Sequence, residues 1–129
     1  MSLGISFRPS HAINLYKGTK VTVQVYLWGP PLKQLGGSTK LTFRTSDRFP
    51  DSMNCTDCVQ IEPKSLVFTS NNWEAGQTIT LTYLNDGHSL FTVDSTGGGY
   101  DWIQYRPEFD VLSCTGNDET GCYQNWRMT

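Results

Sequence analysis

Residues 63–83 read Pro63-Lys-Ser-Leu-Val-Phe-Thr-Ser-Asn-Asn-Trp-Glu-Ala-Gly-Gln-Thr-Ile-Thr-Leu-Thr-Tyr83 and carry the clearest strand pattern of the chain. Leu66 and Phe68 alternate with other positions in the first half, and isoleucine, leucine and tyrosine alternate with threonines in the second. An alternation with a period of two places one set of side chains in a core and the other in water. The stretch therefore predicts two β-strands joined by a turn centred on Asn71-Asn72-Trp73.

Similar short alternations recur along the chain, with turn residues and no helical periodicity between them. The 129 residues have room for one domain with one core. We expect an antiparallel β-sandwich over residues 1–113 and a disulfide-containing C-terminal loop or linker over 114–129. The expected strands are 12–16, 19–28, 39–45, 59–61, the two halves of 63–83, 90–94 and 107–113.

Charge and hydropathy exclude two classes of partner. The formal net charge is −2, the sequence pI is about 5.5, and 17% of the residues are charged. No Lys/Arg run or basic patch appears, so we expect no binding to nucleic acid or to an anionic membrane surface. No apolar run is long enough to cross a bilayer, so we expect no direct membrane insertion.

Four cysteines form two pairs that are close in sequence, Cys55 with Cys58 and Cys114 with Cys122. Local pairing is the simplest of the three possible connectivities, and the sequence alone does not choose among them. Disulfides would place the mature chain in an oxidising compartment.

Two further features bear on the location of the protein. Asn54-Cys55-Thr56 satisfies the N-glycosylation pattern, which has meaning in a secreted eukaryotic protein. The first residues lack the pattern of a signal peptide. The protein is then either cytosolic or a piece of a longer secreted chain. We favour the second interpretation and expect an extracellular or cell-surface location as part of a larger protein.

The spacing Pro63-x-Ser-Leu-x-Phe-Thr-x-x-Asn-Trp-x-x-x-Gln-Thr-Ile-Thr-Leu resembles a repeat of the Calx-β-like, immunoglobulin-type modules of large cell-surface and secreted proteins. The likeness spans roughly residues 12–112, and its specific part is 63–83. It implies an antiparallel immunoglobulin-like β-sandwich of about seven or eight strands, set among neighbouring modules.

Calcium-binding members of these modules carry clustered carboxylates where strands end, and this chain departs from that pattern. Its first turn is Tyr16-Lys17-Gly18, and the later turn Asn85-Asp86 has a single carboxylate. Because Ca²⁺ takes six to eight oxygen ligands, one aspartate does not supply a site. We therefore expect neither a metal nor a cofactor.

A group of aromatic residues supplies the candidate binding surface. Tyr26 and Trp28 lie on the strand face opposite the valines of 19–28, so at least one of them should be exposed or covered by a loop. Exposed aromatic rings stack on sugars or anchor protein interfaces. The alternative is that loops and the 114–129 tail cover them. The four candidate binding residues are Tyr26, Trp28, Tyr100 and Trp102.

Two residues of the 63–83 turn have expected structural roles. Trp73 should place its indole over the end of the core, because a large ring near a strand end contributes apolar burial. Asn72 should bond to the backbone of its own turn, as asparagine does in tight turns.

The chain offers no arrangement typical of catalysis. Cys55-Thr-Asp-Cys58 matches a redox dithiol in spacing, but no helix follows to lower a thiol pKa, and the cysteine gaps do not match those of zinc ribbons or fingers. His11 and His88 lie in different turns. The remaining carboxylates, which show no acid–base pairing and are expected to be solvated, are Asp86, Asp94, Asp101, Glu108 and Asp110.

These observations predict a non-catalytic, extracellular β-sandwich module that acts as a structural spacer, an adhesion unit or a protein–protein interaction unit. Its expected partners are neighbouring modules of the same chain or another surface protein, with glycans as a further candidate. The alternative hypothesis is a carbohydrate-binding module that uses the exposed aromatic residues.

Overall fold

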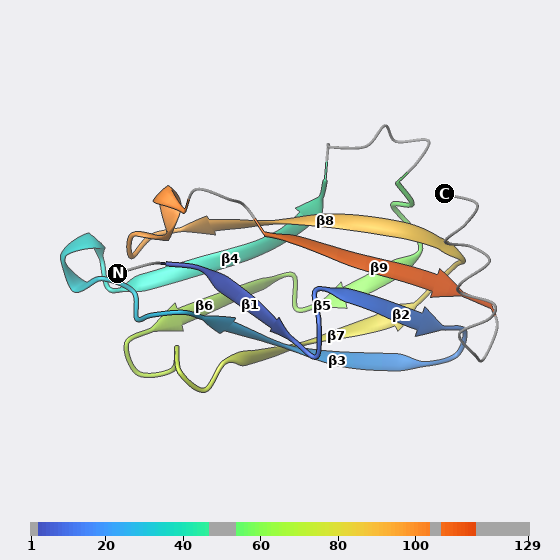
Figure 1. Cartoon of the computed structure of the whole chain (residues 1–129), viewed down its shortest axis with the longest axis horizontal. Coiled ribbons are helices and arrows are strands. Elements are labelled where there is room, and N and C mark those ends of the chain that lie inside the picture. The colour runs from blue at the N-terminus through green and yellow to red at the C-terminus, as the bar shows by residue number, and fades with distance from the viewer. Residues whose placement is uncertain (1–2, 47–53, 104–106, 116–129) are drawn as a thin grey trace.

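The computed structural model describes residues 3–46, 54–103 and 107–115, and in this part the chain is all-β (Figure 1). The described residues form nine strands and two short 3₁₀ helices. Their bounds are β1 Ile5–Arg8, β2 Ala12–Tyr16, β3 Lys20–Leu27, η1 Lys33–Leu35, β4 Ser38–Thr45, β5 Val59–Glu62, β6 Ser65–Thr69, β7 Gln77–Tyr83, β8 Gly87–Thr96, η2 Tyr100–Trp102 and β9 Glu108–Cys114.

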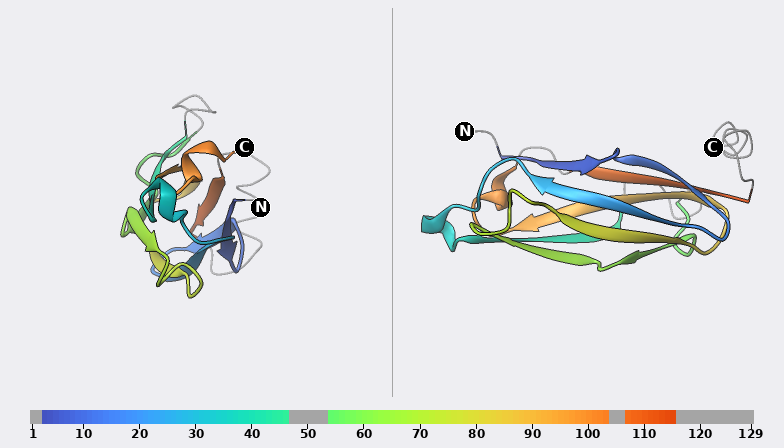
Figure 2. Two further views of the ribbon diagram at one scale, coloured as in Figure 1. Left: turned by 90° about the vertical axis from the view of Figure 1, so that its left-hand side faces the viewer. Right: turned by 90° about the horizontal axis from the view of Figure 1, so that it is seen from below.

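The strands make two sheets that enclose one core (Figure 2). Sheet A has the strand order β1-β3-β7-β5, and sheet B has the order β2-β9-β8-β4-β6. β1 and β2 follow each other in the chain but belong to different sheets, so the first segment crosses from one sheet to the other. The expected all-β, two-sheet architecture is therefore confirmed.

One strand pair departs from the expected antiparallel arrangement. β2 runs parallel to β9, with Ala12 opposite Asp110 and Tyr16 opposite Cys114. The other strand pairs of the described residues are antiparallel. The parallel pair follows from the crossing of the first segment, because β2 continues in the direction of β1 and joins sheet B beside its last strand.

The core lies between the sheets and is filled by alternate residues of each strand. In β3, for example, Val23 and Val25 are fully buried while Gln24 faces solvent. Phe43 and Phe109 meet edge-on in the core, with ring centroids 6.1 Å apart. The core thus has the period-two pattern that the sequence predicts.

The two strands of residues 63–83 lie in opposite sheets. β6 pairs with β4 in sheet B, whereas β7 pairs with β3 and β5 in sheet A. Between them, the Asn72 side-chain oxygen accepts a hydrogen bond of 2.7 Å from the Thr69 N–H, and Trp73 packs partly buried against the core. The segment is therefore a connection from one sheet to the other, closed at the end of the core by an indole.

No helix in the described part of the chain is long and apolar enough to cross a lipid bilayer.

Candidate binding surface

Tyr26 and Trp28 lie at the end of β3, on the outer face of sheet A. Val25 and Leu27 are buried in the core, so the residues that alternate with them point away from it. Trp28 is 58% exposed, and Tyr26 is half-buried. The outer face of this sheet therefore presents an indole beside a phenol.

The indole of Trp28 is held in place by β1 and the residue before it. Its Nε1–H donates a hydrogen bond of 2.6 Å to the Ser6 hydroxyl, and its backbone N–H donates to the Gly4 carbonyl at 2.9 Å. A Cβ atom on Gly4 would lie 2.5 Å from the indole, so one face of the ring rests on the Gly4 backbone. The ring is fixed on that face and open to solvent over the rest of its surface.

Tyr26 is fixed by three contacts. Its hydroxyl donates a hydrogen bond of 2.6 Å to the Gln24 side-chain oxygen. The Arg8 guanidinium carbon lies 4.9 Å from the centre of the phenol ring, within the range of a cation–π contact. On another side the ring approaches Gly76, where a Cβ would lie 2.7 Å from a ring carbon.

These residues form a grid across two strands, because Ser6 is opposite Tyr26 and Arg8 is opposite Gln24. We call this surface the β1–β3 face, and its members are Ser6, Arg8, Gln24, Tyr26 and Trp28. Arg8 is exposed, and no carboxylate of the described residues forms an ion pair with it. The β1–β3 face therefore carries the rings of Tyr26 and Trp28 together with the Arg8 guanidinium, which forms no ion pair with the described residues.

Three members of the β1–β3 face, Ser6, Arg8 and Gln24, are not among the binding residues predicted from the sequence. The sequence did contain a pattern that places the first two, because Ile5-Ser6-Phe7-Arg8 alternates apolar and polar residues as an edge strand does. This strand was not predicted, since four residues that end in Arg8-Pro9 give a short pattern.

Tyr100 is not a surface residue, which corrects the predicted binding set. Its side chain is fully buried, and its hydroxyl donates to the Gly29 carbonyl at 2.7 Å and accepts from the Gly29 N–H at 3.1 Å. Burial raises the pKa of the phenol, and hydrogen bonds from the backbone of Gly29 and Trp28 oppose that rise. Tyr100 fastens η2 to the loop after β3 and is unavailable to a ligand.

Trp102, the fourth predicted binding residue, is 73% exposed in η2. Its backbone N–H bonds to the Gly99 carbonyl at 3.4 Å. Among the described residues, no hydrogen bond or ring–ring contact joins its indole to the β1–β3 face. Trp102 is therefore an exposed ring that we do not count as a member of that surface.

A cavity of about 480 Å³ lies along the edge of β1 that does not pair with β3. Its lining residues come from β1, from the crossing that follows it and from the start of β9. Ser6 borders both the cavity and the β1–β3 face, and His11 and Glu108 give the cavity polar walls.

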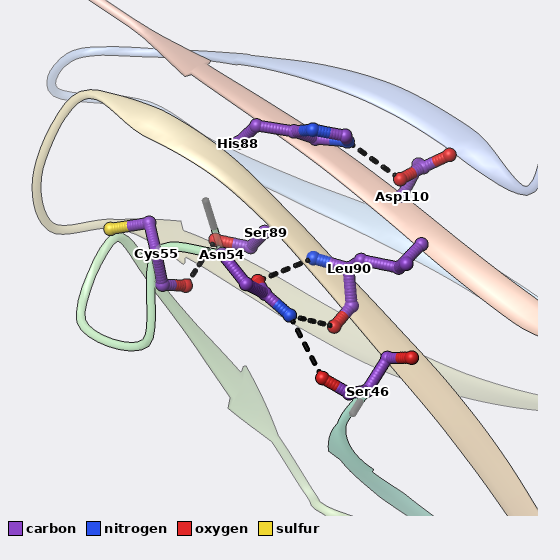
Figure 3. A network of polar contacts seen from close by, with 7 residues as sticks. All are labelled: Ser46, Asn54, Cys55, His88, Ser89, Leu90 and Asp110. Atoms are coloured by element: carbon purple, nitrogen blue, oxygen red, sulfur yellow. Dashed lines mark hydrogen bonds and ion pairs between the residues drawn. The ribbon is translucent and has the colours of Figure 1, made fainter. Parts of the chain in front are cut away.

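The predicted glycosylation site, Asn54, is buried and serves a structural purpose (Figure 3). Its amide nitrogen donates to the carbonyls of Ser46 and Leu90 at 3.2 and 3.1 Å, and its amide oxygen accepts from the Leu90 N–H at 3.0 Å. The side chain replaces a strand partner beside β8, beyond the end of β4. Both polar groups of the side chain are engaged in the interior, so the folded structure leaves this nitrogen inaccessible to a glycan.

The next residues after Asn54 hold a disulfide between Cys55 and Cys58. Gly87 makes room for it, because a Cβ there would lie 2.6 Å from the Cys58 sulfur. Cys55, Asp57 and Cys58 also form the one group of three potential metal ligands among the described residues, and the disulfide occupies both sulfurs. Cys114 is disulfide-bonded as well, and its predicted partner Cys122 lies outside the described residues.

His88 and Asp110 meet on the outer face of sheet B, whereas their positions in the sequence predict separate, solvated residues. The His88 Nε2 and a carboxylate oxygen of Asp110 are 2.7 Å apart, across β8 and β9 (Figure 3). The His88 side chain is 11% exposed. The pair links two neighbouring strands and lies on the opposite sheet from the β1–β3 face.

No protein-family model matches the chain, and no curated protein matches it either.

Proposed function

We propose that this chain is a non-catalytic, immunoglobulin-like β-sandwich module of a larger surface or secreted protein, and that it binds a partner through the β1–β3 face as an adhesion or spacer unit. The observation that carries the proposal is Trp28, a large ring that is exposed and yet fixed by Ser6 and Gly4. A fixed ring loses little conformational entropy when a partner covers it, and such rings are typical anchors of binding surfaces.

The strand order supports the immunoglobulin-like part of the proposal. Constant-type immunoglobulin domains have one sheet in the order A-B-E-D and a second sheet of strands C, F and G. When β1, β3, β4, β5, β7, β8 and β9 are taken as A to G, sheet A has the order A-B-E-D and β9-β8-β4 has the order G-F-C. β2 and β6 are additional edge strands. Neither β3 nor β8 contains a cysteine, so the intersheet disulfide of antibody domains has no counterpart here.

Two features support the proposed context. The Calx-β-like spacing of residues 63–83 falls on the connection between the two sheets. The Cys55–Cys58 disulfide favours an oxidising, extracellular compartment. The Asn54 glycosylation pattern does not support this location, because its amide is buried.

The test uses the natural protein on intact cells and in the secreted fraction. We expect a membrane-impermeant biotin reagent to label it, and peptide mass spectrometry without reduction to recover Cys55 joined to Cys58. A protein that escapes labelling, is missing from the secreted fraction and carries both thiols free would contradict the proposed location and context.

A further inference from the structure

We propose that the β1–β3 face binds an acidic saccharide, with a sugar ring stacked on Trp28 and its carboxylate or sulfate paired with Arg8. This inference rests on the binding role proposed for that face and names the chemistry of its ligand. It depends on two features at opposite ends of this face, a fixed indole and a guanidinium that has no acidic partner among the described residues.

The indole of Trp28 has mostly polar surroundings. Its neighbours on the β1–β3 face are Ser6 and the half-buried Tyr26, and Gln24 and Arg8 extend the polar part of the face beyond Tyr26. The core of a protein–protein interface is normally a continuous apolar patch, which this arrangement lacks. A pyranose ring has an apolar C–H face rimmed by hydroxyls, and it matches a single flat ring surrounded by hydrogen-bonding groups.

The β1–β3 face has hydrogen-bonding groups that no other described residue uses. The Ser6 hydroxyl accepts the indole N–H, and its own hydrogen bonds to no other described residue. The Gln24 oxygen is used by Tyr26, which leaves the exposed Gln24 amide nitrogen free to donate. The free groups around the ring are therefore donors, and sugar hydroxyls and acidic groups accept from donors.

Arg8 supplies the positive charge of the β1–β3 face. Arg8 is exposed and has no ion-pair partner among the described residues. Within sheet A the nearest outward carboxylate belongs to Glu62 on β5, three strands from β1 and thus about 14 Å away. Because a guanidinium binds carboxylates and sulfates in a two-pronged geometry, this site selects an acidic sugar over a neutral one.

The distance between Trp28 and Arg8 limits the size of the ligand. The Trp28 indole rests on Gly4, and Arg8 lies four residues further along the same edge of the sheet, with Ser6 between them. At about 3.3 Å per strand residue, the two ends of the site are roughly 13 Å apart before Arg8 leans back over Tyr26. That length accommodates one or two sugar rings with an acidic substituent.

The test measures saccharide binding by the full chain, through tryptophan fluorescence and calorimetry at low and physiological salt. The probes are oligogalacturonate for carboxylates, heparin-derived oligosaccharides for sulfates, and cellohexaose as a neutral sugar. We expect binding to at least one acidic probe, and we expect added salt to weaken it. The two acidic probes distinguish a uronic acid from a sulfated sugar.

Variants then assign the two contacts. Trp28→Ala should weaken binding of the acidic probe by about tenfold or more, and Arg8→Gln should weaken it by about tenfold. Lys20→Gln is the matched control, because Lys20 is also an exposed cation on the outer face of sheet A, at the other end of β3. Trp102→Ala is the control for an exposed ring elsewhere. Both controls should leave affinity unchanged.

Several outcomes would overturn the inference. Equal binding of cellohexaose would remove the acidic selectivity, and equal losses in Arg8→Gln and Lys20→Gln would indicate non-specific charge attraction. Binding to none of the probes would exclude a saccharide site, and a protein partner lost in Trp28→Ala would then show a protein interface. Trp28→Phe covers the case in which Trp28→Ala fails to fold, because it keeps a ring and should retain part of the affinity. Surface labelling and the Cys55–Cys58 disulfide test the proposed extracellular module, whereas saccharide binding tests the proposed ligand. Either proposal can therefore fail without the other.

Discussion

Asn54 shows how a single side chain takes over the work of a strand. β4 ends at Thr45, and beyond it the Ser46 N–H still bonds to the Leu90 carbonyl of β8, but the Leu90 N–H would lack a partner on that side. The Asn54 amide offers one donor group and one acceptor and bonds to both backbone groups of Leu90, which is nearly fully buried. A buried peptide group without a partner is costly, so this residue is fixed by backbone chemistry.

We expect Asn54→Ala to lower the free energy of unfolding by about 2 kcal/mol, because it leaves the buried Leu90 N–H without a partner and removes one of the two hydrogen bonds to the Leu90 carbonyl, which keeps its bond from the Ser46 N–H. Urea denaturation with the disulfides intact measures this loss. The matched control is Thr56→Ala, which removes the same glycosylation pattern at an exposed residue and should cost less than about 0.5 kcal/mol. A similarly large loss of stability in Thr56→Ala would contradict the role given to the Asn54 amide, because that variant leaves the amide in place.

Tyr100 gives a second prediction at this scale, and it depends on pH. Tyr100→Phe removes two hydrogen bonds to Gly29 and should cost about 1.5 kcal/mol at neutral pH. Burial raises the pKa of the folded phenol above its ordinary value of 10.0, so the unfolded chain releases this proton first as the pH rises. The stability contribution is complete below about pH 10 and is lost as the pH rises through the folded pKa.

The measurement is the free energy of unfolding against pH in the alkaline range. The wild-type protein should lose stability above about pH 10 more steeply than Tyr100→Phe. Tyr83, whose pKa is also raised, chiefly by its hydrogen bond to Asp86, is present in both proteins and cancels in the comparison. Identical slopes would show that Tyr100 ionises as freely in the folded protein as in the unfolded chain.

At the scale of elements, the connection from β4 to β5 depends on the start of β8. The disulfide of this connection packs against Gly87, whose φ is 151°. The Cys58 carbonyl accepts hydrogen bonds from the N–H groups of Leu84 and Asn85, in the turn before β8. The disulfide of this connection therefore contacts β8 at Gly87, where the strand has no side chain.

Gly87→Ala should therefore cost about 3 kcal/mol, because the new methyl group meets the disulfide in addition to the backbone penalty. Gly18→Ala is the control: its φ of 79° also lies in the positive range that alanine rarely adopts, but no atom lies within 4 Å of the added Cβ. We expect this control to cost about 1 kcal/mol. The two losses are compared by urea denaturation, and equal losses would mean that the disulfide moves aside without cost.

Individual strands of this fold could be predicted from the sequence, whereas their assignment to sheets could not. Leu66, Phe68, Ile79 and Leu81 are all buried, as their alternation predicts. Nothing in residues 63–83 indicates that its two strands join different sheets, because that depends on partners distant in the sequence. The parallel pairing of β2 with β9 is non-local for the same reason.

The candidate site shows the same limit. The alternation in β3 places Tyr26 and Trp28 on the outer face of their sheet, and the structure agrees. The burial of Tyr100 depends on a contact with Gly29, which lies 71 residues away in the chain. Likewise, Arg8 comes beside Tyr26 only through the register of β1 against β3. Local patterns give the direction of a side chain but not its neighbours.

At the scale of the whole molecule, stability should not depend on calcium. The Asp86 carboxylate accepts hydrogen bonds from the hydroxyls of Tyr83 and Thr115, and the Asp101 carboxylate accepts from the Gly97 N–H. With these oxygens engaged, six to eight ligands for Ca²⁺ are not assembled there. Thermal unfolding should give the same Tm in EGTA and in millimolar calcium. A rise of several degrees with calcium would contradict the expectation of no metal site.

The parallel pair of β2 and β9 has a mechanical consequence. The two strands run side by side in one direction, so the chain enters β2 at one end of the pair and leaves β9 at the other (Figure 1). Tension applied through these two ends pulls the strands past each other lengthwise. Their five registered residue pairs then carry the load together instead of opening one after another. A module linked to its neighbours through these ends would resist stretching, because β2 and β9 would be loaded in shear.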